Sequence, residues 1–540
     1  MRNVVTRIPE TVQAVMILSR AGLVPFPRLD EGIRSLRTVK QIGPIAGPVR
    51  MSARRDPRKV GIVDELGPLT YSQLESRSNA LARAWSQRGL GEGSVIGVLC
   101  RDHRGLIDSM VASGKLGSRL LLLNTGFAKP QFADVVKREN VSALVYDEEF
   151  APLLEAVDPS IPRFLAWTDS PAAKSDSGTT LEDLIVNTDD RPLPNPSKPG
   201  GFVLLTSGTT GTPKGAPRQV KSGLSAAQLL DRIPMRVNEC TVIAAPLFHG
   251  TALSQFIMSF ALGCTVVVRR KFDPETTLRM IQDNKATELV VVPVMLQRIL
   301  DLGEDVVGSY DTSSLRIVFS AGSALSPELG NRATKAFGDV IYNLYGSTEV
   351  AVATVATPED WRAAPGTVGK VPCGCRVNLY DDHGNRITEP DVIGRIFVGS
   401  DLAFAGYTDG RNKEIIDGLL SSGDVGHFDS AGRLFIDGRD DDMIVSGGEN
   451  VYPVEVENLL AEHPGVVEAA VIGVTDPEFG QRLQAFVVRR DGIELDEEGV
   501  KAHVKANLAR YKVPRDVRFL ESLPRNPTGK LLRGKLSEMA

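Results

Sequence analysis

The sequence has few cysteines and no long apolar run, and both absences exclude whole classes of protein. Five cysteines occur in 540 residues, and so sparse and odd a set does not form a disulfide framework. No apolar run reaches the roughly 18 residues that a membrane-spanning helix needs. The N-terminus also lacks the basic start, apolar block and small-residue cleavage site of a signal peptide. We therefore expect a cytoplasmic protein in a reducing compartment.

Basic patches are missing as well, which argues against nucleic acid as a partner. There are 62 Lys and Arg against 67 Asp and Glu, a net charge of −5, and no long basic run or basic–aromatic stripe. An anionic ligand must therefore be held by local positive groups. The chain is 42% apolar and 24% charged, a globular balance. Its length predicts several domains or subdomains.

Short apolar runs alternate with helical segments from about residue 51 onward. Such runs, rich in β-branched residues or leucine, are typical of buried parallel strands in α/β units. They are Val95–Cys100, Leu120–Leu123, Ala143–Tyr146, Phe202–Leu205, Val242–Ala245, Thr265–Val268, Leu289–Val292, Leu315–Phe319 and Val340–Leu344. We therefore predict an α/β fold, with a large N-terminal domain of stacked α/β subdomains and mostly parallel sheets.

Changes in this pattern divide the chain. Residues 1–50 have scattered prolines and no strand–helix alternation, so we expect an N-terminal appendage. Its apolar cluster Val12–Val24 would form a helix packed on the main body or a peripheral membrane contact. Residues 51–438 form the large domain, and the charged stretch 439–441 separates it from a small α+β domain at 442–540.

A loop rich in glycine and hydroxyl side chains follows the strand Phe202–Leu205. It reads Thr206-Ser207-Gly208-Thr209-Thr210-Gly211-Thr212-Pro213-Lys214-Gly215. The glycines let backbone N–H groups approach an anion closely. The hydroxyls add donors, and Lys214 adds a positive charge suited to phosphate. The spacing is not that of the Walker loop, G-x-x-x-x-G-K-[ST]. The loop therefore predicts a phosphate site outside the Walker class.

The decapeptide resembles the signature of the adenylate-forming superfamily, which contains acyl- and aryl-CoA synthetases, luciferases and the adenylation domains of peptide synthetases. Four further matches follow in the expected order: Ser320–Ala324, Tyr342–Glu349, Ser422–Gly426 and Pro524–Lys530. The resemblance covers roughly residues 51–540. It implies an enzyme that uses ATP and Mg²⁺ to activate a carboxylic acid as its adenylate and then passes the acyl group to coenzyme A.

The resemblance also implies which residues bind the nucleotide. Tyr345 would stack on adenine, and Thr348 would donate to an α-phosphate oxygen. Glu349 would bind Mg²⁺, because a carboxylate without a cation would repel the phosphates. Asp424 would accept hydrogen bonds from the ribose hydroxyls, and Arg439 would add a ribose or phosphate contact. The implied nucleotide-binding set is Ser207, Gly208, Thr209, Thr210, Gly211, Gly322, Ser323, Ala324, Asn343, Tyr345, Gly346, Ser347, Thr348, Asp424 and Arg439.

The small C-terminal domain is implied to be a mobile lid. Lys530 would enter the active site during adenylation and, with Lys214, stabilise the negative charge of the reacting phosphates. Rotation about residues 439–441 would then withdraw Lys530. Gly447 and Gly448 would let the pantetheine arm of coenzyme A pass close to the backbone. The implied catalytic residues are Thr206, Lys214, His249, Glu349 and Lys530.

The acyl site is less sharply defined. His249 lies in the motif Ala244–Gly250, and it is either a packed histidine or a residue at the mouth of the acyl pocket; the position of the motif favours the second. No aspartate lies between Cys240 and Arg270 to hold an ammonium group, which favours an acid without an α-amine. The chain departs from the family pattern at Gly394-Arg395, where Gly-Glu is usual; we interpret this as a structural exchange.

These observations favour a medium- or long-chain fatty acid:CoA ligase of lipid metabolism, with fatty acid, ATP and coenzyme A as its partners. Other interpretations stay open. The acceptor would be a carrier protein in an acyl-AMP ligase, and the acid would be aromatic or short in other CoA ligases. A nucleotide-binding regulatory protein with a degenerate site is disfavoured by the intact motif residues.

Overall fold

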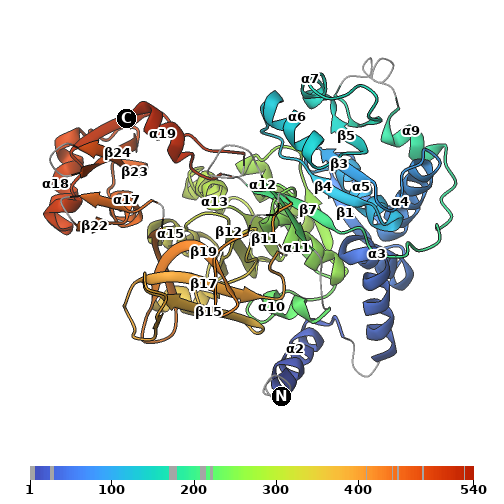
Figure 1. The fold of residues 1–540 in the computed structure, drawn as a ribbon, viewed down its shortest axis with the longest axis horizontal. Coiled ribbons are helices and arrows are strands. Elements are labelled where there is room, and N and C mark those ends of the chain that lie inside the picture. The colour runs from blue at the N-terminus through green and yellow to red at the C-terminus, as the bar shows by residue number, and fades with distance from the viewer. Residues whose placement is uncertain are drawn as a thin grey trace.

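The computed structural model describes most of the chain and arranges it as a large body with a smaller C-terminal lobe at one side (Figure 1). The described residues are 7–24, 29–169, 179–206, 214–218, 223–404, 406–408, 410, 412–440, 442–446, 449–476, 480–527 and 529–540. Within them the strands form four sheets.

The central sheet contains the predicted apolar runs that follow residue 240, and the earlier runs belong to a second sheet. In spatial order its strands are β14 (Thr354–Ala356), β13 (Ile341–Tyr345), β12 (Ile317–Ala321), β11 (Glu288–Val291), β9 (Cys240–Ile243), β10 (Thr265–Val268), β1 (Val60–Asp64) and β2 (Gly67–Thr70). The pairings from β13 to β1 are parallel, and only the edge strands β14 and β2 are antiparallel. Helices that belong with this sheet are α10 (Ala227–Leu230), α11 (Gly250–Ala261), α12 (Pro274–Asn284), α13 (Pro293–Leu300), α14 (Glu304–Gly308), α15 (Pro327–Phe337) and α16 (Pro358–Ala363).

A second sheet contributes the strand that precedes the phosphate loop. Its order is β6 (Arg163–Trp167), β5 (Ala143–Asp147), β3 (Val95–Leu99), β4 (Arg119–Leu122), β7 (Phe202–Thr206) and β8 (Lys214–Arg218). It is parallel except at β8, which pairs with β7 as an antiparallel hairpin and brings Thr206 opposite Lys214. The helices α5 (Arg104–Leu116), α6 (Lys129–Arg138), α7 (Ala151–Leu154) and α9 (Leu181–Val186) follow its strands along the chain, and α4 (Tyr71–Ser86) contacts α5 and the central-sheet strands β1 and β2.

The third sheet was not predicted, because it is wholly antiparallel and carries no crossover helices. It contains β16 (Arg386–Ile387), β15 (Cys375–Tyr380), β17 (Gly394–Ser400), β19 (Leu419–Phe428), β18 (Ile415–Ile416) and β20 (Leu434–Arg439). Neighbouring strands need only short turns in such a meander. The prediction of mostly parallel sheets is therefore confirmed for two of the three sheets of the large domain.

The C-terminal lobe has its own sheet and core. Its elements are β21 (Ile444–Ser446), β22 (Glu449–Val451), α17 (Pro453–Ala461), β23 (Val466–Asp476), β24 (Gly480–Arg489), α18 (Glu497–Asn507), β25 (Asp516–Leu520) and α19 (Arg533–Met539). Val456, Leu460, Val471 and Val487 are among the residues that fill its core. Pro453 begins α17 as predicted.

In the described part of the N-terminal segment, residues 7–24 and 29–55, the chain forms α2 (Arg7–Ala21) and α3 (Leu29–Arg55), and α3 has a kink at Gly43, where φ is 86°. Ile17 and Leu18 are buried, as are Ile42 and Val49, and all four belong to the main hydrophobic core. The cluster on α2 thus packs on the main body, and α3 runs through the boundary expected at residue 50. No helix in the described ranges combines the length and the apolar character needed to cross a bilayer.

Candidate active site

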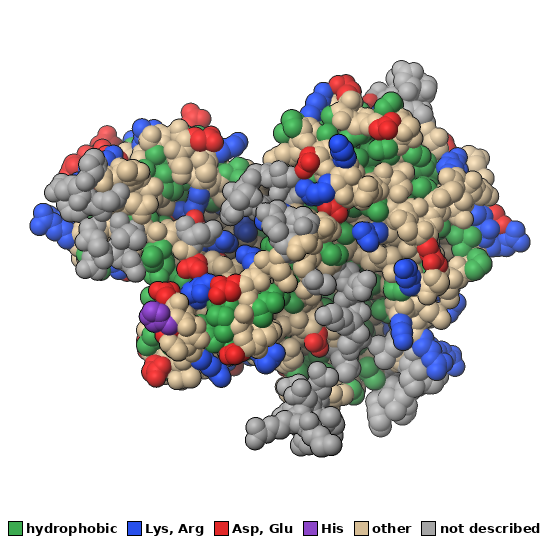
Figure 2. Space-filling view, viewed as in Figure 1, with side chains coloured by type: hydrophobic (Ala, Val, Ile, Leu, Met, Phe, Trp, Pro, Cys, Tyr) green, Lys and Arg blue, Asp and Glu red, His purple; other side chains and the backbone are tan. Residues whose placement is uncertain are grey.

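A single cavity of about 2200 Å³ receives most of the predicted site residues. It lies where the carboxyl ends of β12 and β13 meet the C-terminal lobe, and strand ends are the usual place for ligands in such sheets. Figure 2 shows a notch between this lobe and the body, with Lys and Arg side chains beside it. The predicted residues that line the cavity are Lys214, His249, Gly322, Ser323, Ala324, Asn343, Tyr345, Gly346, Ser347, Thr348, Glu349, Asp424, Arg439 and Lys530.

Part of the predicted site lies outside the described residues. This part comprises Ser207, Gly208, Thr209, Thr210, Gly211, Gly447 and Gly448. Thr206 ends β7, and its backbone pairs with Lys214 across the hairpin. The roles of these residues stay predictions. The two ends of the phosphate loop are nevertheless fixed at the cavity, because Lys214 lines it.

Glu349 is held as an ionised carboxylate. Ser347 Oγ donates a hydrogen bond to its Oε2 at 2.9 Å, and the Tyr407 hydroxyl donates to its Oε1 at 2.7 Å. Burial pushes the pKa of Glu349 upward, but the hydrogen bonds from Tyr407 and Ser347, with the charge of Lys413, leave that pKa below its usual value. A charged oxygen ligand suits Mg²⁺, so this residue fits the expected metal.

Tyr407 is a site residue that the sequence analysis missed. Besides bonding Glu349, its ring lies 5.1 Å from Lys214 Nζ, measured to the ring centroid. It therefore connects the carboxylate proposed for the metal with the cation proposed for the phosphates. It lies 58 residues beyond Glu349 in a loop after β17, and none of the motifs identified in the sequence includes it.

Tyr345, Asp424 and Arg439 form a second cluster. The Tyr345 hydroxyl donates to Asp424 Oδ2 at 2.6 Å, and Arg439 Nε lies 3.7 Å from Oδ1. The register of β19 and β20 places Asp424 directly opposite Arg439. Burial raises the pKa of Asp424, and the hydroxyl and the guanidinium oppose that rise. Burial and the neighbouring carboxylate raise the pKa of Tyr345 well above its usual value, so its hydroxyl stays a donor.

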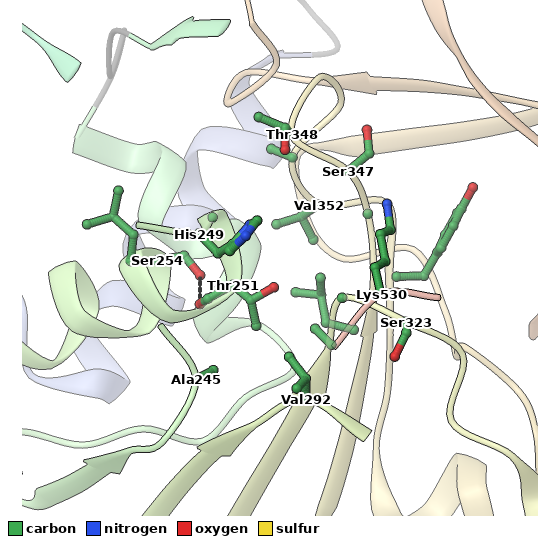
Figure 3. A pocket seen from close by; sticks show the side chains of 18 of the residues that line it. Ala245, His249, Thr251, Ser254, Val292, Ser323, Ser347, Thr348, Val352 and Lys530 are labelled. Atoms are coloured by element: carbon green, nitrogen blue, oxygen red, sulfur yellow. Dashed lines mark hydrogen bonds between the residues drawn. The ribbon is translucent and has the colours of Figure 1, made fainter. Parts of the chain in front are cut away.

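His249 immediately precedes α11, and its ring faces the cavity (Figure 3). Its Nε2 is shielded from solvent and has no hydrogen-bond partner among the described residues. Burial, reinforced by the charge of Lys530, lowers the pKa of this imidazole to about 3. The ring is therefore neutral at physiological pH. A buried nitrogen of this kind is available to a ligand.

Lys530 enters the same cavity from the C-terminal lobe, and in Figure 3 its side chain points between Ser323 and Ser347. Its backbone N–H donates to Asn526 Oδ1 at 2.9 Å. The preceding Gly529 has φ of 79°, and a Cβ there would lie 2.6 Å from Val294 Cγ1. Glycine therefore satisfies both the backbone angle and the close approach to the large domain.

Arg395, at the departure from the family pattern, has a definite role in the fold. It forms an ion pair with Glu414, and its Nε lies 3.2 Å from Asp440 Oδ2. The backbone N–H of Asp440 also donates to the carbonyl of Gly423 at 3.1 Å. The guanidinium thus ties the segment between the domains to the antiparallel sheet, a partnership that the sequence analysis did not identify.

Comparison with known proteins identifies the family of the chain. A model of AMP-binding enzymes matches residues 49–408, and a model of the AMP-binding enzyme C-terminal domain matches residues 455–530. An indoleacetate–CoA ligase of Aromatoleum aromaticum is 31% identical over 495 residues, 90% of this chain and 96% of the relative. A fatty acid–[acyl-carrier-protein] ligase of Streptomyces coeruleorubidus is 30% identical over 498 residues, 90% of this chain and 94% of the relative.

Solved structures share the fold over nearly the same length. An anthranilate CoA ligase in complex with anthranoyl-AMP superimposes with a TM-score of 0.82 at 26% identity, covering 91% of this chain and 97% of that one. The o-succinylbenzoate CoA synthetase of Bacillus subtilis, with its acyl-adenylate intermediate, gives 0.78 at 25% identity, covering 91% and 97%. The chain therefore belongs to the AMP-binding enzyme family of the adenylate-forming superfamily, and it is an AMP-forming acid–thiol ligase that uses ATP, Mg²⁺ and a thiol co-substrate such as coenzyme A.

Proposed function

We propose that this enzyme is a fatty acid:CoA ligase, which forms a medium- or long-chain acyl-adenylate and transfers the acyl group to coenzyme A. The observation that carries the proposal is one cavity in which two lysines, an ionised glutamate and a neutral histidine adjoin an apolar extension along α11. The polar part of the cavity suits a nucleotide triphosphate, and the apolar part suits an alkyl chain.

In the first step a carboxylate oxygen of the acid forms a bond to the α-phosphorus of ATP. The bond from that phosphorus to the bridging oxygen breaks, and pyrophosphate leaves with the electron pair. Lys214 and Lys530 stabilise the negative charge that accumulates on the phosphate oxygens. Mg²⁺ bound at Glu349 would supply further charge neutralisation to the phosphates. His249, which is uncharged, would contact the carboxylate of the acid, and the positive charge at the reacting groups would come from the two lysines.

The nucleotide would be held by the second cluster. The Tyr345 ring, fixed through its hydroxyl to Asp424, offers a face for adenine. Asp424 accepts from ribose hydroxyls, and Arg439 beside it limits the repulsion between this carboxylate and the phosphates. Thr348 and the hydroxyls of the phosphate loop donate to phosphate oxygens.

In the second step the thiol sulfur attacks the acyl carbon and gives up its proton. The carbon–oxygen bond to AMP breaks, so the products are a thioester and AMP. We propose that the C-terminal domain rotates about residues 439–441 between the two steps, because Lys530 occupies the space beside the acyl site in the conformation described here.

The identity of acid and acceptor is tested directly by product analysis. A panel from acetate to palmitate, with indoleacetate added, is incubated with ATP and Mg²⁺ in the presence and absence of coenzyme A. Acyl-CoA and AMP formed most efficiently from C8–C16 acids would support the proposal. Acyl-adenylate that accumulates with coenzyme A present would support the alternative of a carrier-protein ligase. The Streptomyces relative is a ligase of that kind. Preference for indoleacetate or acetate would favour the aryl or short-chain alternative.

A peripheral membrane contact would use the outer face of α2. Val12, Val15 and Met16 stand at i, i+3 and i+4 and are exposed, so they form one apolar stripe. Such a stripe suits insertion at a lipid surface. Co-sedimentation with phosphatidylglycerol–phosphatidylcholine vesicles tests this contact. Met16→Asp should reduce the fraction of protein that sediments with the vesicles. Equal co-sedimentation of Met16→Asp and the unmodified enzyme would refute the membrane contact.

A further inference from the structure

The cavity continues past His249 along one face of α11. Gly250, Thr251, Ser254, Ile257 and Ala261 are partly accessible and line it, and they recur at the three- and four-residue spacing of one helical face. Ser254 Oγ donates to the Thr251 carbonyl at 2.8 Å, so this hydroxyl is already satisfied (Figure 3). The face therefore offers a surface with little demand for polar partners.

The opposite face of α11 is closed. Ala252, Phe256 and Phe260 are almost completely buried in the main core. The cavity-lining face therefore extends over the whole length of α11, from Gly250 to Ala261. At 1.5 Å per residue, Gly250 and Ala261 lie about 17 Å apart along the axis. With carbon–carbon bonds of about 1.5 Å in a zigzag, this distance takes an extended chain of roughly 13 carbons.

Side chains from α2, from the turn directly after it and from α3 line the same cavity. They are Leu18, Leu23, Val24, Val39 and Pro48, and all five precede the first residue of the family match at 49. Gly22, at the end of α2, has φ of 87°, and a Cβ there would lie 2.7 Å from Val237 Cγ1. A glycine at this position lets α2 end directly against the body of the enzyme.

Basic side chains mark where the apolar lining stops. Arg34, Arg54 and Arg55 also line the cavity, and all three belong to α3. A methylene chain gains free energy by contact with the apolar residues and gains none by contact with charged guanidinium groups. The lining therefore changes from the polar adenylate site, through an apolar section along α11, to a cationic rim.

We propose that α2 and α3 form the distal wall of the acyl cavity, so that this enzyme selects an elongated, unbranched apolar acid by its length. The inference rests on the proposed function, since it assigns the apolar section to the tail of the acid activated beside His249. It gives residues 7–55 a direct part in substrate selection, which the family-matched region alone does not provide. The chain-length optimum is expected near 12–16 carbons, the length that reaches α2.

Two substitutions test the wall at its far end. Val24→Trp fills the cavity from the turn after α2, and Ala261→Phe fills it from the end of α11. Each variant should lower kcat/KM for palmitate at least tenfold while that for octanoate stays within about twofold. The retained octanoate activity also shows that the variant is folded. Gln13→Trp, which adds the same ring at an exposed position of α2, is the matched control and should leave the chain-length profile unchanged.

A binding measurement separates this inference from the proposed function. Displacement of a fluorescent long-chain fatty acid by palmitate and octanoate reports the cavity without turnover, and Val24→Trp should weaken palmitate alone. If both variants activate fatty acids of every chain length as the unmodified enzyme does, the proposed distal wall is refuted and the proposed ligase function is unaffected. If Ala261→Phe shortens the chain-length profile and Val24→Trp does not, the turn after α2 is not part of the wall and the assignment of this segment is wrong. If no acid supports ATP–pyrophosphate exchange yet palmitate binding responds to Val24→Trp, the proposed function fails and the cavity assignment stands.

Discussion

Replacing Lys530 with alanine should separate the two half-reactions. Its side chain reaches the cavity beside His249 and Asp424. Its positive charge contributes to the lowered pKa of His249 and opposes the rise in the pKa of Asp424. It is the group that the C-terminal lobe places nearest the reacting phosphates in our proposal. Loss of the side chain removes a positive charge that is needed only when phosphate charge develops.

The magnitude follows from where the lysine sits. Lys530 is exposed within an open cavity, so its interactions belong to the intermediate dielectric of a protein surface rather than to a dry interior. Two unit charges about 4 Å apart interact by about 4 kcal/mol at an effective dielectric constant of 20. We therefore expect Lys530→Ala to slow adenylation by roughly 10³-fold.

The assay is run on each half-reaction separately. ATP–pyrophosphate exchange with palmitate measures adenylation, and transfer from synthetic palmitoyl-adenylate to coenzyme A measures thioester formation. Transfer should change by no more than a few fold. Lys535→Ala is the matched control, because Lys535 is exposed, lines the same cavity and belongs to the same lobe. Equal loss of both half-reactions in Lys530→Ala, or an equal loss of exchange in Lys535→Ala, would refute the division of labour.

Three further predictions concern other parts of the molecule. Glu349→Gln should raise the Mg²⁺ concentration for half-maximal exchange by 10- to 100-fold, and an unchanged titration would exclude this residue as a ligand. Arg395→Ala should shift the balance between domain orientations by about 1.5- to 5-fold, because the exposed contact with Asp440 is worth about 0.2–1 kcal/mol; the readout is the ratio of exchange to transfer rates. Burial raises the pKa of Glu288 to about 8, so the folded state holds its proton more tightly than the unfolded state. The stability that this provides is complete below about pH 4.5 and is lost as pH rises to about 8, by at most about 5 kcal/mol. Chemical denaturation across that pH range measures the free energy of unfolding, which should change less with pH in Glu288→Gln than in the unmodified enzyme. Identical pH dependence in the two proteins would contradict the raised pKa of Glu288.

Much of the fold could be predicted because local patterns encode it. The strands of the two parallel sheets are continuous apolar runs, and Pro453 correctly predicted the start of α17. The antiparallel sheet was missed because its strands are only half-buried and no helix separates them. In β20, for example, only Leu434 is fully buried. Such strands lack the continuous apolar run that made the parallel strands recognisable.

The site was predicted where a residue belongs to a compact motif and missed where a distant partner completes it. Tyr345 and Asp424 were assigned separately to the nucleotide, yet the hydrogen bond between them joins residues 79 apart. Tyr407 and the contact of Arg395 with Asp440 depend on strand register and loop path. These are properties of the assembled structure that no local pattern contains.

The continuity of α3 has a practical consequence for shortened versions of this enzyme. A protein begun at residue 49, where the family match starts, would lose Ile42, Ile45 and Ala46, each at most 5% exposed in the main core. The part of the core that these side chains cover would then be open to water, and only Val49, Arg50 and Ser52 would still bury the remaining turns of the helix. Insolubility of such a truncated protein would therefore reflect a removed piece of the core, and it would say nothing about whether the catalytic centre is sound.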